Sequence, residues 1–401
     1  MSTDLWPIIN LGQQSMSGTF PKKKNEYVPT GTLELVKCMG DCGLVQSKFS
    51  FDRDLMYGEN YGYESAINQT MRDHLKLKVK KITNMVNFEE GDLVIDIGSN
   101  DGTLLSEYHK MFWKIGIDPS AARFFKKYEE NGINLFIDYF DKSLFNQFPK
   151  AMAITTIAMF YDLEDPLHFM MDVKNILDQE GVWVMEQSYM PFMLKNNSYD
   201  TICHEHIEYY SLTQIKWMAD KVGLKIVDVN FNTINGGSFE VILSHNNNHY
   251  GQNVSKINKI LMWESQFSEL EPFDKFRINV AANRDFLIQY MRTIYNEQRR
   301  LFGYGASTKG NVILQYCGLT DMDIMFIADR NPEKIGKFTP GTNIEIISEE
   351  EARLMRPDFF FVLPWHFKDE IIQREQAYLK QGGKLLFPLP NLRIERNQNE
   401  S

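Results

Sequence analysis

The feature that most constrains this chain is a glycine turn set between two short apolar stretches. Residues 95–102 read I-D-I-G-S-N-D-G, and the next apolar stretch, residues 114–117, ends at Asp118, twenty residues after Gly98. This pattern predicts a strand, a turn and a helix start, followed by a second strand that ends in an acid. Glycines let a backbone approach a ligand, and a carboxylate at a strand end can accept hydrogen bonds from two ribose hydroxyls. The sequence therefore predicts an α/β domain with an adenosyl cofactor site.

The spacing of the turn favours one kind of cofactor. A dinucleotide fingerprint reads G-x-G-x-x-G, and here Asn100 stands where the second glycine belongs. S-adenosylmethionine has no pyrophosphate and does not need that glycine, so it is the better candidate. The alternative is a plain glycine turn without a ligand, which the position of Asp118 disfavours.

Length and hydrophobic pattern predict three parts in the chain. At 401 residues the chain is long for one core, and ordinary domain sizes favour two or three. Residues 1–65 look irregular and predict a small lobe; residues 66–253 alternate helices and strands, which predicts a parallel sheet covered by helices. Residues 254–401 predict a long amphipathic helix and a second α/β domain. The helices are expected at 66–86 and 274–299, and the strands at 32–36, 94–97, 114–117, 134–137, 152–157, 182–186, 324–328, 359–363 and 384–387.

Composition narrows the class of partner. The formal net charge is -10 and the pI is near 5.4, which disfavours a nucleic acid substrate because a phosphate backbone calls for a basic surface. The chain shows no charged leader and no apolar run of roughly 20 residues, so we expect no membrane span and a cytoplasmic protein. A small or tethered metabolite is the expected partner. The sequence specifies no oligomeric state.

The four cysteines are too few and too scattered for a disulfide framework. Only Cys38 and Cys42 have the spacing of metal ligands, and a tetrahedral zinc site would need two more ligands from elsewhere. Zinc is therefore possible but doubtful.

The densest polar cluster spans residues 199–210 and contains His204, Glu205 and His206 in a row. Three consecutive ionisable groups cannot all face a core, so at least one should point into a cleft or to solvent. A histidine oriented by a carboxylate is a ready general base near neutral pH. Two other interpretations stay open, namely a solvated turn and a metal-binding histidine pair, for which two ligands are weak evidence.

Three glycine-containing segments could also contact ligands. Residues 57–65 alternate tyrosine and glycine, which suits a flat cofactor or a sugar, or simply a loop packed on the next helix. Residues 235–238, N-G-G-S, allow close approach of a ligand or form a hairpin turn. In residues 303–310, G-Y-G-A-S-T-K-G, Lys309 supplies a cation for phosphate, while the last glycine comes two positions late for a dinucleotide fingerprint.

Taken together, these strings closely resemble the sugar C-methyltransferases over residues 11–390. The resemblance rests on the order C-x3-C-G-L-V-Q, Y-G-Y-x-S, D-I-G-S-N-D-G, H-E-H-x-x-Y-Y-S-L, N-G-G-S, G-Y-G-A-x-x-K-G and P-W-H-F-K-D-E. Members of this family are S-adenosylmethionine enzymes that methylate a carbon of a nucleotide-linked keto-deoxysugar. The resemblance implies a zinc-binding N-terminal lobe, a central Rossmann-like methyltransferase sheet and a C-terminal Rossmann-like domain, with a nucleotide-diphosphate sugar held between them.

The resemblance also implies roles for particular residues. Cofactor binding falls to Gly98, Ser99, Asn100, Gly102, Asp118 and Tyr63. Substrate binding falls to Tyr61, Gly236, Gly237 and Lys309, the last near the diphosphate. His206 is the implied catalytic histidine, with Glu205 and His204 beside it.

Two departures from the family pattern stand out. The first of the family's two cysteine pairs, expected before Leu11, is absent, which puts zinc in doubt. Some members carry a tyrosine, a candidate base or oxyanion partner, where this chain has Cys203, and that shifts the catalytic burden to His206 or His204.

The expected chemistry is removal of a proton next to a ketone, followed by methyl transfer to the resulting enolate carbon. We expect His206 to be the base, with Glu205 setting its tautomer. Three rivals remain: a nucleotide-sugar oxidoreductase with NAD in the C-terminal domain and Asp329 as the ribose acid, an O-methyltransferase, and a non-catalytic protein with a decayed site.

Overall fold

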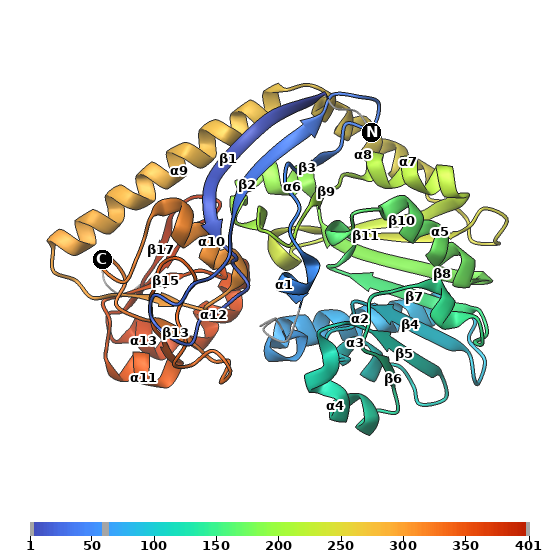
Figure 1. The fold of residues 1–401 in the computed structure, drawn as a ribbon, viewed down its shortest axis with the longest axis horizontal. Helices are drawn as coiled ribbons and strands as arrows, with labels where there is room; N and C mark the ends of the chain where they lie inside the picture. The colour runs from blue at the N-terminus through green and yellow to red at the C-terminus, as the bar shows by residue number, and fades with distance from the viewer. Residues whose placement is uncertain (1–3, 58–63, 398–401) are drawn as a thin grey trace.

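Three β-sheets organise the chain in the computed structural model, which describes residues 4–57 and 64–397. They belong to an N-terminal lobe, a central domain and a C-terminal domain (Figure 1). The predicted α/β class, with two sheet-and-helix domains and a small N-terminal lobe, is confirmed. The domain boundaries after residues 65 and 253 stay predictions.

The central domain is built on a seven-stranded sheet. Strands β8, β7, β4, β5 and β6 are parallel neighbours in that order, and β11 and β10 extend the β8 edge antiparallel. The predicted parallel strands are confirmed, and the antiparallel edge is an addition, because the short turn between β10 and β11 can only join antiparallel strands. The bounds are β4 (Leu93–Ile97), β5 (Trp113–Ile117), β6 (Asn134–Phe136), β7 (Ala151–Ile157), β8 (Leu177–Ser188), β10 (Leu224–Asn232) and β11 (Ser238–His245).

Helices cover both faces of this sheet. Successive residues of a strand point to opposite faces, so Val94 packs with Leu75 and Val79 of α2, whereas Ile95 packs with Met170 of α5 and Ile215 of α7. The helices of the first two parts are α1 (Arg53–Tyr57), α2 (Gln69–Met85), α3 (Thr103–Ser106), α4 (Phe125–Glu130), α5 (Pro166–Ile176), α6 (Met190–Lys195) and α7 (Leu212–Val222).

The C-terminal domain repeats the α/β plan with a six-stranded sheet. Its order is β14-β13-β12-β15-β16-β17, in which the first five strands are parallel and β17 is antiparallel. The strands are β12 (Leu301–Tyr304), β13 (Ile327–Asp329), β14 (Ile346–Ser348), β15 (Phe359–Val362), β16 (Lys384–Phe387) and β17 (Arg393–Glu395), and the helices are α10 (Thr308–Cys317), α11 (Glu349–Leu354), α12 (Lys368–Arg374) and α13 (Gln376–Lys380).

The N-terminal lobe is more regular than its sequence suggested. Its sheet has the order β1-β2-β3-β9, with β1 (Leu5–Ser15), β2 (Thr30–Cys38), β3 (Val45–Ser47) and β9 (Glu208–Tyr209). The expectation of irregular structure before residue 32 is wrong for β1, an 11-residue strand that packs against α9 and α10. The strand β9 follows the H-E-H cluster directly, so the lobe sheet fixes the position of that cluster.

A long helix, α9 (Glu271–Asn296), runs along the outside of the molecule from the lobe to the C-terminal domain, and α8 (Val254–Glu264) precedes it (Figure 1). It begins with Pro272 in its first turn, where the missing amide costs nothing, and it buries Phe273, Phe276, Val280 and Leu287. Within the described residues no helix has the length and apolarity that a membrane span requires.

The strand orders determine where ligands can bind. In open α/β sheets the crevice lies at the carboxyl ends of the strands, at the point where the strand order reverses direction. That point falls between β4 and β7 in the central sheet and between β12 and β15 in the C-terminal sheet. The glycine segment at residues 98–102 follows β4, and the one at residues 303–310 begins within β12 and continues past its end. Both segments therefore lie at switch points.

Candidate active site

A cavity of about 380 Å³ is lined by the carboxyl ends of both sheets. The central domain contributes residues 96–101, 117–120, 138–140, 157–159, 161–163 and 203, 205 and 206, and the C-terminal domain contributes residues 304–309, 329–331 and 334 and segments after β15. The two predicted ligand loops, one from each domain, therefore face a single shared space.

The loop after β4 is shaped by positive backbone angles and by Asp118. Gly98 has φ +74°, and a Cβ there would lie 2.9 Å from Met159 Cγ. Asn100 also has φ +50°, and its amide donates to Asp118 Oδ2 at 2.8 Å. The other oxygen, Oδ1, accepts from the amide and hydroxyl of Ser120 at 2.7 and 2.6 Å. The carboxylate of Asp118, which follows β5, thus helps to fix the conformation of the loop after β4.

These residues fit S-adenosylmethionine. A carboxylate has about four acceptor positions, and the contacts above use one on Oδ2 of Asp118, which leaves that oxygen able to accept a ribose hydroxyl. Ile97, Ile117 and Phe140 supply apolar surface for an adenine ring in the same cavity. Gly98, Ser99 and Asn100 also line it, as predicted by position. The carboxylate and the apolar walls together suit a charged nucleoside ligand with a flat base.

Gly102 does not line the cavity. It begins α3 with φ +74°, and a Cβ would lie 3.1 Å from the ring of Tyr128. Its role is therefore the turn itself, which corrects its assignment to direct cofactor contact. Tyr61 and Tyr63 lie outside the described residues, so their roles stay predictions.

Asp96 and Asp138 are among the acids of the cavity wall that were not predicted from the sequence. Asp96 is buried in β4, and burial raises its pKa to about 7, although the hydroxyl of Thr155 donates to Oδ1 at 2.6 Å and opposes this shift. Asp138 comes two residues after β6, at the same edge of the sheet. The sequence could have indicated both acids, because one lies near the end of β4 and the other follows β6, at the carboxyl edge of the sheet where ligands bind.

Asp96 should make stability depend on pH near neutrality. Because the folded-state pKa is raised to about 7, the protonated form is favoured on folding, and its stabilising effect is lost as the pH rises from the unfolded value through 7. Between pH 6 and pH 8 this loss is about 1.4 kcal/mol. Asp96→Asn should remove it, as measured by denaturant unfolding at both pH values. The exposed Asp369→Asn is the control, and a parallel loss in both variants would contradict the assignment.

Asp118→Ala should weaken binding of S-adenosylhomocysteine by about 1 to 3 kcal/mol, because it removes a charged acceptor and frees the Asn100 amide. Asp118→Asn, which keeps the shape and one oxygen, should lose less. Calorimetric titration measures both. Equal affinity of Asp118→Ala and the unaltered protein would show that this acid does not hold the ribose.

His206 faces the same cavity with a defined tautomer. Its Nδ1 lies 2.9 Å from the carbonyl oxygen of Thr201, which can only accept, so Nδ1 carries the proton and Nε2 keeps its lone pair. Burial and the nearby charge of Lys309 together lower the pKa of His206 to about 3, although the hydrogen bond to Thr201 opposes this change. The ring of Tyr161 packs against the imidazole at 4.2 Å. The neutral imidazole is therefore available as a proton acceptor across the physiological pH range.

The expectation that Glu205 sets this tautomer is wrong, because Thr201 does so. Glu205 is buried on the cavity wall, and one of its oxygens, Oε2, has no hydrogen-bond partner among the described residues. Burial raises the pKa of Glu205, whereas hydrogen bonds from Cys203 and Ser17 oppose that change. Glu205 and His206 both line the cavity from a turn in which the His206 amide donates to the carbonyl oxygen of Cys203 at 3.3 Å.

His204 does not line the cavity. Its Nε2 lies 3.2 Å from the carbonyl oxygen of Gln14, and its ring packs edge-on against Phe51 at 4.8 Å. It joins the cluster to the N-terminal lobe, which corrects its assignment as a catalytic residue.

A further carboxyl group, Asp162, lies beside Glu205 and was not predicted. Burial raises the pKa of Asp162 well above its usual value, and the charge of Glu205 raises it further, while a hydrogen bond from Tyr57 lowers it. Oδ1 of Asp162 has no partner among the described residues. Its sequence position after β7 was the only indication, because that loop belongs to the switch point. Cys203 and the two carboxyls give this end of the cavity three buried polar groups.

The N-G-G turn at residues 235–237 lies where the central and C-terminal domains contact each other. Asn235 lines the cavity, but Gly236 and Gly237 do not: Cβ atoms there would lie 3.1 Å from the ring of Trp365 and 2.9 Å from Phe192. Their φ angles of +89° and +126° explain why glycine is required. The glycines therefore allow close packing, which corrects their assignment to substrate contact.

The loop at residues 303–310 resembles a nucleotide-binding loop, but a protein side chain occupies the space beside its second glycine. Gly305 has φ +80°, and its missing Cβ is replaced by Pro364, whose ring carbons lie 2.6 Å from the Cβ position. Asp329 accepts the amides of Ala306 at 2.6 Å and Asn331 at 2.7 Å. A pyrophosphate cannot approach the glycine as it would in a dinucleotide site, which argues against the NAD oxidoreductase interpretation.

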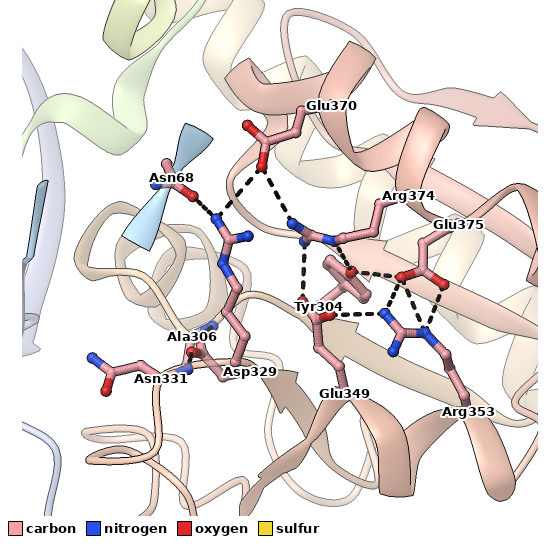
Figure 2. A network of polar contacts seen from close by, with 11 residues as sticks. Asn68, Tyr304, Ala306, Asp329, Asn331, Glu349, Arg353, Glu370, Arg374 and Glu375 are labelled. Atoms are coloured by element: carbon pink, nitrogen blue, oxygen red, sulfur yellow. Dashed lines mark hydrogen bonds and ion pairs between the residues drawn. The ribbon is translucent and has the colours of Figure 1, made fainter. Parts of the chain in front are cut away.

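Cations gather at this edge of the C-terminal sheet. Arg374 donates to Tyr304 Oη at 2.9 Å, to Glu349 at 3.0 Å and to Glu370 at 3.3 Å (Figure 2). Lys334 donates to the carbonyl of Ala306 at 2.7 Å. Arg374, Lys334 and Arg330 all line the cavity, and together with the start of α10 they make this end suitable for an anion.

Cys38 and Cys42 would supply only two of the four ligands that a tetrahedral zinc site needs. Cys38 is buried, and both thiols are free. Burial raises the pKa of the Cys42 thiol, and the hydrogen bond and charge of Cys38 raise it further. In residues 4–57 and 64–397 no third histidine, cysteine or acid joins them in a group that could hold a metal. The pair does not fit a tetrahedral zinc site.

Comparisons with known proteins match most of the chain to methyltransferases. Residues 69–229 match a family described as a methyltransferase domain, and residues 233–390 match the C-methyltransferase C-terminal domain. C-methyltransferase NovU of Streptomyces niveus is 27% identical over 368 residues, which cover 90% of this chain and 87% of that protein.

Solved structures match part of this chain at lower similarity. An S-adenosylmethionine-dependent methyltransferase of Clostridium acetobutylicum is 15% identical, with 45% of this chain and 93% of that chain covered and a TM-score of 0.35. Magnesium protoporphyrin IX methyltransferase of Synechocystis with bound S-adenosylhomocysteine is 12% identical, with coverage of 46% and 90% and a TM-score of 0.35.

The sequence matches cover both halves of the cavity, the cofactor loop in one domain and the cationic edge in the other. The chain is therefore an S-adenosylmethionine-dependent methyltransferase that carries the C-terminal domain of the C-methyltransferases.

Proposed function

We propose that the enzyme methylates a carbon next to the ketone of a nucleotide-linked keto-deoxysugar. One observation supports this most directly: a single cavity joins the cofactor loop and His206 to the cationic edge of the C-terminal sheet. A nucleotide sugar has a reactive ring at one end and a diphosphate at the other, so it suits a cavity that has a base and an anion site. The name of the relative from Streptomyces niveus, a C-methyltransferase, supports transfer to carbon.

In this proposal, the C-terminal domain holds the diphosphate. Arg330, Lys334 and Arg374 line that side, and the N-terminus of α10 adds its dipole and its first amides. Glu370 and Glu349 hold the arginine side chains in place before the substrate arrives. Such preorganisation reduces the entropy lost on binding.

The sugar ring would then lie against the carboxyl groups and His206. Asp162 and Glu205 each keep one buried oxygen without a hydrogen-bond partner among the described residues, which makes both candidates to bond to sugar hydroxyls. Nε2 of His206 accepts the proton from the carbon next to the ketone, and the enolate that forms stabilises the imidazolium beside it. When bound, S-adenosylmethionine supplies the electrophilic methyl group. The enclosing walls exclude water and align the two reactants, which is where most of the acceleration of such a step arises.

The test begins with calorimetric titration of S-adenosylhomocysteine and, separately, of NAD. We expect micromolar binding of the first and none of the second. Turnover is then assayed with methyl-¹³C-labelled S-adenosylmethionine and a panel of 4-keto-6-deoxyhexoses linked to thymidine, uridine, cytidine or guanosine diphosphate. A carbon-bound methyl signal by NMR supports the proposal. An oxygen-bound methyl would instead identify an O-methyltransferase, and NAD binding would restore the oxidoreductase.

A further inference from the structure

Lys309 lies at the meeting point of the two domains. It stands in the first turn of α10 in the C-terminal domain, yet its Nζ donates to the carbonyl oxygen of Asn235 in the central domain at 3.1 Å. Asn235 adopts φ +55°, and Gly236 allows the turn to close against Trp365. The two conspicuous motifs, N-G-G-S and G-Y-G-A-S-T-K-G, thus meet through this one contact.

The ammonium group of Lys309 is left with capacity for a ligand. An ammonium has three N–H donors, and the Asn235 carbonyl takes one. Within the described part of the chain no carboxylate lies within 4 Å of Nζ; Asp200, whose charge acts on Lys309, gives one oxygen to Trp365 Nε1 at 2.8 Å instead. Burial lowers the pKa of Lys309, and the charges of Asp200 and Cys203 oppose that change. A half-buried cation on a cavity wall with donors to spare can bond to a ligand oxygen there.

The electrostatic neighbours of Lys309 place it at the reactive end of the cavity. Its charge acts on His206, His366, Asp200 and Cys203. Lys334, which lines the same cavity, is instead coupled to Asp329, Lys337, Arg123 and Glu333. Nζ of Lys309 bonds to the carbonyl oxygen of Asn235 in the central domain, whereas Nζ of Lys334 bonds to that of Ala306 in the C-terminal domain, so the two ammonium groups have different surroundings. This separates Lys309 from the cationic edge that suits a diphosphate.

We propose that Lys309 donates a hydrogen bond to the ketone oxygen of the substrate and stabilises the enolate that forms on it, in place of contacting the diphosphate. This inference rests on the proposed function. It assigns the second group that enolate chemistry requires, since His206 removes the proton and a separate donor must face the oxygen. Both groups line one cavity, one from each domain, so the reactive centre is complete only when the domains are packed together.

In the enolisation step, the C–H bond next to the ketone breaks, and its proton moves to His206 Nε2. The bonding pair forms the carbon–carbon double bond of the enolate, and the carbonyl π pair moves to oxygen, where the Lys309 ammonium stabilises it. The enolate carbon then forms a bond to the methyl carbon, the sulfur–methyl bond breaks with its pair left on sulfur, and the carbonyl re-forms.

Enolisation can be measured without methyl transfer. The enzyme is incubated in D₂O with S-adenosylhomocysteine and a keto-deoxysugar nucleotide, and uptake of deuterium at the acidic carbon is followed by mass spectrometry. We expect Lys309→Met to slow exchange at saturating substrate by about 10²–10³-fold, the usual effect of removing one oxyanion donor. Its affinity for the nucleoside diphosphate without sugar should stay within about twofold. The matched variant Lys334→Met should instead weaken binding of the nucleoside diphosphate without sugar.

Each outcome decides between defined possibilities. Normal exchange in Lys309→Met, or a loss of nucleoside diphosphate affinity like that of Lys334→Met, would overturn the assignment. Lys309→Gln replaces Lys309→Met if the latter does not bind S-adenosylhomocysteine as a folded protein does, and the same slow exchange is expected. If the unaltered enzyme exchanges no proton of any keto-sugar nucleotide, the proposed function itself fails and this inference with it.

Discussion

His206→Ala is expected to lower turnover by about 10²–10⁴-fold while leaving the affinity for S-adenosylhomocysteine unchanged. The variant removes the Nε2 lone pair that we propose as the proton acceptor, and general-base catalysis contributes roughly this factor. The residues proposed to hold the cofactor lie on the loops after β4 and β5, so they should be unaffected. Turnover is measured by formation of methylated sugar, and cofactor affinity by calorimetry.

The neighbouring histidine provides the control. His204→Asn should keep near-normal turnover once folded, because His204 bonds to Gln14 outside the cavity. A His206→Ala enzyme with turnover within a few-fold of the unaltered protein would exclude His206 as the base. Equal losses of turnover in both variants would show that each substitution disrupts the structure of the whole segment, residues 204–206.

Lys78→Met is expected to destabilise the protein by about 3 to 5 kcal/mol. Nζ of this buried lysine donates to Glu186 at 2.7 Å and contacts Glu240, both of which are also buried. Burial raises the pKa of Glu240, but the charges of Lys78 and Lys81 more than offset this and lower it to about 2. Removing Lys78 leaves two buried carboxylates with too little positive charge, which costs more than the intact network contributes.

Denaturant unfolding monitored by circular dichroism measures this effect. Lys80→Met, an exposed site on the same helix, should change stability by less than about 0.5 kcal/mol. Adding Glu240→Gln to Lys78→Met should recover part of the loss, because one unpaired charge is removed. A loss below about 1 kcal/mol in Lys78→Met would show that His74 and Lys81 compensate the two acids on their own.

This network also supports the cavity. Glu186 lines the cavity from β8, and residues at the start of α2, including Asn68 and Met71, form part of the same wall. Lys78 joins α2 to β8 and β11 through the two carboxylates. A partly folded Lys78→Met protein should therefore lose cofactor affinity as well as stability.

Local patterns were predictable because neighbouring residues produce them. The strand ending at Ile97, the positive φ at Gly98 and the acid at Asp118 follow from short-range sterics and hydrogen bonds, and the structure has them as expected. The strand at Lys384–Phe387 has the predicted bounds. The long strand β1 was not predicted, because its regularity depends on pairing with β2 and packing on α9, not on its own sequence.

The sequence by itself determined the α/β class, the cofactor loop and the presence of His206 in a polar cluster, since each depends on residues close together in the chain. Only the tertiary structure decided which atoms meet. It gave His206 the carbonyl of Thr201 as its partner, turned His204 toward the N-terminal lobe, and brought Lys309 to Asn235 across the domain seam. Side-chain direction and contacts between residues 74 or 190 positions apart follow from how whole elements pack, and that information is spread over the entire fold.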